Sequence, residues 1–256
     1  METRGDTVGR GGSDVTRREL VVGATVLAML PFPVAAEPGR NEKQMLADWP
    51  WLGRYAAENE ALKANGAKID AVFMGDSISE FWKLRRPAFF PESWVMRGIS
   101  GQTSGQMVLR MMADVVALRP RVVHILAGTN DVAGNTGSMT PQMTIDNIAA
   151  MAEIANAHKI GVLIGAILPV DRFYWNPTGS PAGLVKSLNR SLKTFAANSG
   201  FRFIDYHAAM TDANGGLPRT LAEDGVHPNA QGYAVMEALV RPVLSKALKK
   251  TRRAAG

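Results

Sequence analysis

The chain has 256 residues, of which 46% are hydrophobic, and it carries a formal net charge of +6. This length and composition suit one sizeable globular domain and exclude a disordered or collagen-like chain. The absence of cysteine excludes disulfide bonds, a thiol nucleophile and cysteine-ligated metal sites.

The positive charge is concentrated near the end of the sequence. After Glu237 there is no acidic residue, and a basic segment of this kind suits the C-terminal end of a helix dipole. No basic patch alternates with aromatic residues, so we expect no nucleic-acid partner. The basic residues of this segment are Arg241, Lys246, Lys249, Lys250, Arg252 and Arg253.

Residues 1–36 have the pattern of an export signal. Arg17 and Arg18 precede an apolar stretch at residues 20–30, and Val34 and Ala36 are small residues placed as in a signal-peptidase site. The stretch is too short to span a membrane, and the segment resembles a twin-arginine signal. An ordinary export signal and an uncleaved anchor remain alternatives. We therefore expect a periplasmic or extracellular domain at residues 37–256.

The rest of the chain alternates between short apolar runs and segments with helical spacing. This alternation predicts a mainly parallel sheet covered by helices on both faces, which is a three-layer α/β/α domain. Ligands bind at the carboxyl ends of the strands in such sheets. Strands are expected at 69–74, 94–97, 121–127, 160–167 and 201–204, and helices at 41–64 (broken at Pro50), 103–118, 145–158, 181–198 and 230–248.

Ser77 follows the first expected strand and is the first candidate for chemistry. A serine hydroxyl at the start of a helix acts as a nucleophile when a base accepts its proton. Serine is also a common helix cap, so this residue alone does not decide between the two roles.

Candidate donors to an oxyanion follow the next two strands. Gly101 lies after the second strand, where a glycine lets its backbone N–H approach a substrate closely. Asn130 lies after the third strand and offers a side-chain amide, although asparagine is also common in turns. Each of these signals is weak by itself.

Asp224 and His227 lie in the loop after the fifth strand. A carboxylate three residues before a histidine can hold the Nδ1 atom and leave Nε2 free as a base. A single Asp-x-x-His is common, but here four candidate groups follow four strands on one side of a sheet. Together they predict the active site of a serine hydrolase.

The ordered motifs resemble those of the SGNH hydrolases, also called the GDSL esterase and lipase superfamily. The resemblance covers residues 69–248 and implies a flavodoxin-like α/β/α sandwich with five parallel strands. Ile78 stands where the family name implies leucine, which is a mild departure. The four blocks are Gly75-Asp76-Ser77, Ile99-Ser100-Gly101-Gln102-Thr103, Gly128-Thr129-Asn130-Asp131 and Asp224-Gly225-Val226-His227-Pro228.

The resemblance implies a role for each candidate. Ser77 would be the nucleophile, His227 the general base and then acid, and Asp224 the residue that orients His227. The backbone N–H groups of Ser77 and Gly101 would form the oxyanion hole with the side-chain amide of Asn130. The implied activity is hydrolysis of a carboxylic ester through an acyl-enzyme, without metal or organic cofactor. A short acyl or acetyl ester, on a small molecule or a glycan, is the expected substrate.

Three alternatives compete with this assignment. A lysophospholipase or thioesterase of the same fold would have the same motifs. A non-catalytic domain that binds an ester-bearing glycan would not need the four site residues. An α/β-hydrolase would need a G-x-S-x-G motif, in which Ser79 replaces the second glycine here.

Phe173, Tyr174 and Trp175 follow the fourth strand. They form either a wall for an acyl chain or sugar face, or a contact that packs the loop onto the body, and the sequence leaves both open. Arg172 suits either an anionic group of the substrate or an ion pair.

Other polar residues are expected to be structural. Within an apolar strand, His124 is expected to be a hydrogen-bonded core residue. His207 follows the fifth strand, and there too we favour a structural role. We expect Asp76 and Asp131 to hold loops rather than to transfer protons.

Overall fold

The computed structural model describes residues 42–177 and 179–254, with side chains described as far as residue 250. The predicted export signal lies outside these residues. All of the described residues belong to one compact unit.

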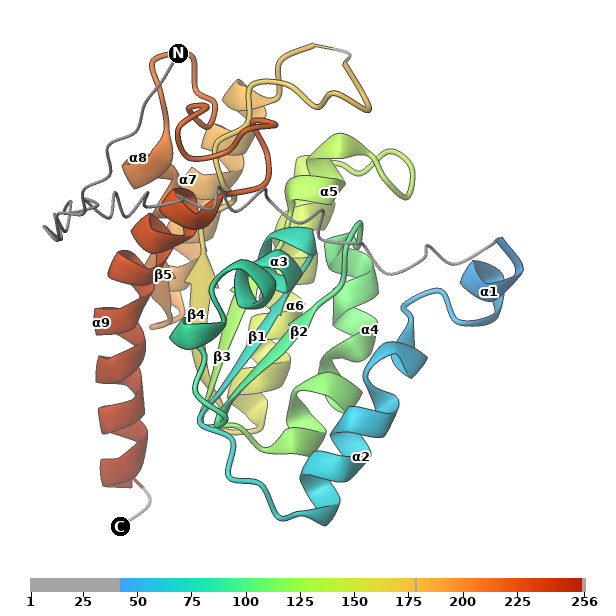
Figure 1. Ribbon diagram of the computed structural model, residues 1–256, viewed down its shortest axis with the longest axis vertical. Coiled ribbons are helices and arrows are strands. Elements are labelled where there is room, and N and C mark those ends of the chain that lie inside the picture. Colours follow the sequence, from blue (N-terminus) through green and yellow to red (C-terminus); the bar gives the residue numbers. More distant parts are fainter. Residues whose placement is uncertain (1–41, 178, 255–256) are drawn as a thin grey trace, which may run out of the picture. The chain divides into compact units, whose positions relative to one another are not determined.

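Five parallel strands form the sheet, in the order β2-β1-β3-β4-β5 (Figure 1). The chain passes from β1 to one neighbour, β2, and then returns to the other side of β1 to form β3, so the winding reverses beside β1. Ligands bind at such reversals in open α/β sheets. The strands are β1 (Ala71–Gly75), β2 (Trp94–Gly98), β3 (Val122–Leu126), β4 (Gly161–Gly165) and β5 (Arg202–Ile204).

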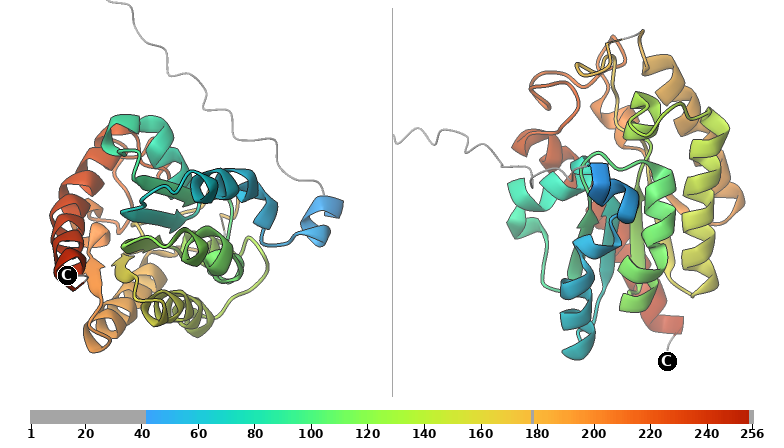
Figure 2. Two further views of the ribbon diagram at one scale, coloured as in Figure 1. Left: turned by 90° about the horizontal axis from the view of Figure 1, so that it is seen from below. Right: turned by 90° about the vertical axis from the view of Figure 1, so that its right-hand side faces the viewer.

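Helices cover both faces of the sheet, which confirms the predicted three-layer α/β/α fold (Figure 2). The covering helices α4, α6 and α7 pack on one face, whereas α3, α8 and α9 pack on the other. The α-helices of the described residues are α1 (Glu42–Ala47), α2 (Ala56–Ala64), α3 (Ser77–Arg85), α4 (Ser104–Asp114), α5 (Thr129–Ala133), α6 (Pro141–Ala157), α7 (Ala182–Asn198), α8 (Tyr206–Met210) and α9 (Ala230–Ala254).

Alternate residues of β1 supply the two cores. Val72 and Met74 face the core that α4 and α6 cover, while Ala71 and Phe73 face the core that α3 and α9 cover. All five residues of β1 are buried, as expected for a central parallel strand with helices on both faces. This rigid strand ends directly before Ser77.

The expected elements differ from the observed ones mainly at their ends. The expected helix at 103–118 ends at Asp114 and continues as a separate 3₁₀ turn, Val116–Leu118. The segment 41–64 divides into α1, a 3₁₀ turn (Leu52–Arg54) and α2. The short helices α5 and α8 were not predicted, because five residues are too few to show a helical period.

No helix among the described residues is both long enough and apolar enough to cross a membrane.

Candidate active site

Ser77, His227 and Asp224 lie together at the carboxyl edge of the sheet. Ser77 begins α3 directly after β1, and the other two residues lie in the loop before α9. Ser77 Oγ is 2.9 Å from His227 Nε2, and His227 Nδ1 is 2.7 Å from Asp224 Oδ2. These contacts join residues that are 150 positions apart in the chain. The arrangement lets a serine hydroxyl pass its proton to an imidazole whose other nitrogen faces a carboxylate.

The Asp224 carboxylate fixes the orientation of the imidazole. Its Oδ1 atom accepts hydrogen bonds from the backbone N–H groups of Val226 and His227. Although burial acts in the opposite direction, these bonds and the one from the His227 side chain hold the pKa of Asp224 well below its usual value. An ionised carboxylate at Nδ1 favours the tautomer that carries its proton there, so Nε2 is the basic nitrogen.

The helix that carries Ser77 also supports His227. The Phe81 ring lies 5.3 Å from the His227 ring, and Arg85 donates to the carbonyl oxygen of Pro228. Both contacts come from α3. Ser77 and the loop that carries His227 are therefore both held by α3.

Gly101 lies in the loop after β2, and Asn130 lies in α5, after β3. Gly101 has a φ of 77°, a left-handed conformation that favours glycine. Asn130 donates through Nδ2 to the carbonyl of Gln102 at 3.0 Å, and its Oδ1 accepts from Asn135 at 2.7 Å. An amide carries two N–H donors, so this orientation leaves one of them for a ligand.

The loop at residues 98–103, which we name the oxyanion loop, contacts the nucleophile helix directly. Glu80 of α3 accepts from the backbone N–H and the hydroxyl of Ser100, at 2.8 and 2.6 Å. A Cβ atom on Gly98 would lie 2.8 Å from the carbonyl oxygen of Asp76, so only glycine fits there. This close approach packs the end of β2 against the start of α3.

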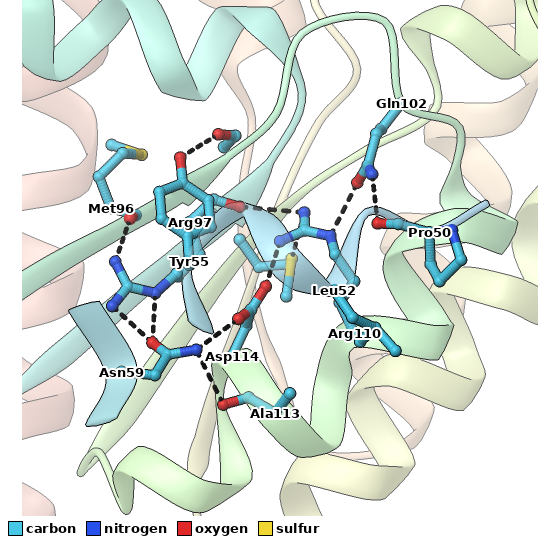
Figure 3. A network of polar contacts seen from close by, with 12 residues as sticks. Pro50, Leu52, Tyr55, Asn59, Met96, Arg97, Gln102, Arg110, Ala113 and Asp114 are labelled. Carbon is cyan, nitrogen blue, oxygen red and sulfur yellow. Dashed lines mark hydrogen bonds and ion pairs between the residues drawn. The ribbon is translucent and has the colours of Figure 1, made fainter. Parts of the chain in front are cut away.

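A buried polar network holds the other side of the oxyanion loop (Figure 3). Arg110, which is fully buried, donates to the side chain of Gln102 at 2.8 Å and to the carbonyl of Arg97 at 3.1 Å. Its guanidinium also pairs with Asp114. Tyr55 donates to the carbonyl of Gly98. Patterns in the sequence gave no sign of this network, because its members lie on separate elements.

The second buried arginine of the network faces away from the oxyanion loop. The Arg97 guanidinium donates to Asn59 at 2.9 and 2.6 Å and pairs with Glu58, both on α2. The two fully buried guanidinium groups therefore differ in their partners. Arg110 donates to Gln102 in the loop that carries Gly101, whereas Arg97 donates to Asn59 of α2.

This difference yields a prediction for Arg110→Met and Arg97→Met. Both variants should lower the free energy of unfolding, because each removes a buried hydrogen-bonded charge. Only Arg110→Met should also lower kcat, by about 10- to 100-fold, since a small shift of the oxyanion loop misplaces a donor. Ester hydrolysis is measured well below the melting temperature of each variant, with urea unfolding as the measure of stability. Equal losses of kcat in the two variants would show that Arg110 has no special link to the site.

Asp76 is a buried carboxyl beside the nucleophile. Its Oδ1 atom accepts from the backbone N–H of Ile78 and caps α3, whereas its buried Oδ2 has no hydrogen-bond partner among the described residues. Burial raises the pKa of Asp76 to about 7, opposed by the Ile78 N–H and His227 and reinforced by Asp131. The cap confirms the structural role expected for this residue.

The raised pKa predicts how stability depends on pH. An unfolded aspartate has a pKa of about 4, so between pH 4 and the folded pKa of about 7 only the folded state keeps the proton. The free energy of unfolding should therefore fall as pH rises through this window, by up to about 1.4 kcal/mol per pH unit from this group. Asp76→Asn keeps the cap and should remove this contribution, while the exposed Glu153→Gln should not. Urea unfolding of the three proteins from pH 4 to 8 measures the difference, and parallel curves would contradict the assignment.

The three aromatic residues after β4 differ in their exposure to solvent. Phe173 is only 3% exposed and packs in the core, which favours the second of the two roles left open for it, packing of the loop onto the body. Tyr174 and Trp175 are 62% and 40% exposed and lie at 4.7 Å from each other, edge to face. Trp175 Nε1 donates to Asn135, the residue that orients Asn130. The exposed pair is therefore connected to the oxyanion side of the site.

The other polar residues have structural contacts. His124 is fully buried and bonded to Tyr206 at 2.9 Å, and burial lowers its pKa to about 3, so it is a neutral core residue as expected. Asp131 accepts from the backbone and side chain of Ser104, which ties the start of α4 to α5, a structural role as expected. The partly buried His207 carries no hydrogen bond at Nε2 within the described residues.

In the part of the chain that the structure describes, no three acidic or histidine side chains gather as a metal site would require.

Residues 73–235 match the GDSL-like lipase/acylhydrolase family. The acetylxylan esterase of Geobacillus stearothermophilus is 27% identical over 159 residues, which are 58% of this chain and 72% of that enzyme. A solved structure from Bacteroides fragilis NCTC 9343 is 41% identical and superposes with a TM-score of 0.75, covering 78% of this chain and 99% of its own. A GDSL-like lipase from Bacteroides thetaiotaomicron VPI-5482 is also 41% identical, with a TM-score of 0.73 and the same coverage.

Proposed function

Since the chain belongs to the GDSL-like lipase/acylhydrolase family of the SGNH hydrolases and is a hydrolase of ester bonds, we propose that it cleaves carboxylic esters through an acyl-enzyme on Ser77. One observation carries the proposal. The chain of hydrogen bonds from Ser77 through His227 to Asp224, at 2.9 and 2.7 Å, lies beside the oxyanion loop. A serine that served only as a helix cap would not need this contact to a histidine.

The proposed mechanism begins with proton transfer. His227 Nε2 takes the proton of Ser77 as Oγ attacks the carbonyl carbon, and Asp224 stabilises the imidazolium that forms. The oxyanion accepts hydrogen bonds from the backbone N–H groups of Ser77 and Gly101 and from the free amide N–H of Asn130. His227 then returns the proton to the leaving alcohol, and water attacks the acyl-enzyme by the reverse sequence of steps.

We further propose that the acyl group is short, with acetyl as the leading candidate. The similarity to an acetylxylan esterase supports an acetyl group on a glycan. Export of the chain, as its first 36 residues predict, would bring it to such polymers outside the cell. A lysophospholipase or thioesterase is the competing assignment, and it would require a long acyl chain or a thioester.

Two measurements test the proposal. A fluorophosphonate that carries a reporter group should label the protein, because it reacts with serine nucleophiles that have an adjacent base. Ser77→Ala is the control and should not label, whereas Ser79→Ala, which removes the buried hydroxyl of the same helix turn, should. p-Nitrophenyl esters from acetate to palmitate, with acetylated xylan and a lysophospholipid, then assign the acyl length. A wild-type protein that neither labels nor hydrolyses any of these esters would refute the proposal.

A further inference from the structure

A hollow of 370 Å³ lies beside the loop that carries Asp224 and His227, which we name the base arm. It opens between the loop after β4 and the long loop between α8 and α9. Its wall includes Asp224, whose carboxylate holds the Nδ1 atom of His227, and the Nε2 atom of that imidazole contacts Ser77 Oγ. The polar and aromatic residues of its lining are Asp171, Arg172, Tyr174, Asp212, Arg219 and Asp224.

A larger hollow of 730 Å³ elsewhere in the protein does not lie at the candidate active site. Its lining includes Ile69, Asp70 and Arg121, which precede β1 and β3. It therefore opens at the amino ends of the strands, at the edge opposite the candidate active site.

The arginines and aspartates that line the smaller hollow do not neutralise one another through direct contacts among the described residues. Asp171 and Arg172 are both exposed and have no hydrogen bond or ion pair with any described residue. Asp212 accepts from the backbone N–H groups of Asn214 and Gly216 through one oxygen only. No ion pair within 4.0 Å joins the arginines to the aspartates of this hollow among the described residues. Donors and acceptors thus remain available to a ligand.

The chemistry of the lining indicates what that ligand is. Apart from Asp224, which is engaged with His227, the hollow has two carboxylates and two guanidinium groups, and the charges of these four groups cancel. Carboxylates accept hydrogen bonds and guanidinium groups donate them, and a hydroxyl does both. Leu217 is its one aliphatic lining residue, which does not suit an acyl chain. Its volume is near the lower end of the range of roughly 300–1,000 Å³ for small-molecule sites, enough for a single small ring.

The position of the hollow indicates which part of an ester it would hold. The leaving alcohol must lie near His227 Nε2, because that nitrogen returns the proton to it. The hollow adjoins the base arm, whereas the oxyanion donors Gly101 and Asn130 come from the loops after β2 and β3. Tyr174 lines the same hollow as Asp224, so its ring lies near the base arm as well.

We propose that this hollow binds the leaving alcohol of the substrate and that the alcohol is a neutral sugar. The inference rests on the proposed function and adds to it, because it assigns selectivity to the alcohol rather than to the acyl chain. Asp171 and Asp212 accept from sugar hydroxyls, and Arg172 and Arg219 donate to them. The exposed ring of Tyr174, which lines the hollow, offers an apolar face to the sugar ring.

Three acetyl esters that differ only in the alcohol test the inference. They are p-nitrophenyl acetate, methyl 3-O-acetyl-β-D-xylopyranoside and glycerol triacetate, and kcat/KM is measured for each. In Arg172→Ala, and separately in Asp171→Asn, the ratio of kcat/KM for the sugar ester to that for p-nitrophenyl acetate should fall at least tenfold. The corresponding ratio for glycerol triacetate should change less than threefold. Arg190→Ala, which removes an exposed arginine of α7 outside the hollow, is the matched control and should keep both ratios.

The outcomes separate this inference from the proposed function. Ratios that stay at the wild-type value in both variants would overturn the sugar subsite while the esterase assignment stands. An equal fall for glycerol triacetate would also overturn it, since the hollow would then recognise any polar alcohol. If the wild-type protein hydrolyses none of the three esters, the proposed function itself fails. A fall that is confined to the sugar ester supports the subsite.

Discussion

Ser77→Ala should reduce kcat for ester hydrolysis by roughly 10⁴-fold or more, with little change in the melting temperature. The hydroxyl is the only group lost, and the one hydrogen bond that it makes within the described part of the chain is to His227 at 2.9 Å. The helix cap is not affected, because Asp76 rather than Ser77 accepts from the backbone N–H of Ile78. Initial rates with p-nitrophenyl acetate and a thermal melt measure the two quantities.

The double variant Ser77→Ala/His227→Ala is the control for this result. If the two residues act as one unit, the double variant should be about as slow as either single variant. Ser79→Ala removes the buried hydroxyl two residues along the same helix and should retain most of the wild-type kcat. Substantial turnover by Ser77→Ala would mean that the nucleophile lies elsewhere.

Asn130→Ala should lower kcat by about 10²- to 10³-fold, the usual effect of losing one oxyanion donor, with KM similar to that of the wild type. The loss falls on kcat because the amide N–H meets full negative charge only in the transition state. Asn130 also donates to the Gln102 carbonyl, so part of the loss could come from a displaced loop. Kinetics with p-nitrophenyl acetate over a range of concentrations separate kcat from KM.

Two further variants distinguish the loss of the Asn130 donor from a displacement of the loop. Asn130→Asp keeps an acceptor for Asn135 but removes the donor and adds negative charge, so its kcat should be at least as low as that of Asn130→Ala. Asn135→Ala leaves the donor in place and removes only its support, so it should lose about tenfold or less. If Asn135→Ala were as slow as Asn130→Ala, loop position rather than donation would explain the result.

The fold was readable from the sequence because its elements carry strong local signals. The continuous apolar runs around Val72, Val123 and Leu163 are typical of parallel strands buried on both faces, and each is a strand. Element ends were less accurate, since capping decides them. The chain at Thr103 illustrates this point, because its capping box with Gln106 starts α4 one residue later than expected.

The candidate site was partly readable. Ser77, Asp224 and His227 stand in recognisable motifs, and parallel strands bring the residues that follow them to one edge. The residues that support the site could not be predicted. Arg110 and Glu80 contact the oxyanion loop from helices, and no local pattern in the sequence shows which side of each helix faces that loop. The role of Phe173 stayed open for a related reason: an aromatic residue in a loop has the same sequence signal whether it faces solvent or the core.

The 150 residues between nucleophile and base have a consequence for the timing of activity. If His227 is the base of Ser77, as proposed, a chain that has been synthesised only as far as residue 226 has the serine without its base, and the serine is an ordinary alcohol. Hydrolytic activity would therefore appear abruptly, when the loop before α9 is complete and Arg85 can hold the carbonyl of Pro228. Nascent chains would be harmless to cellular esters throughout most of their synthesis, with no separate inhibitor required.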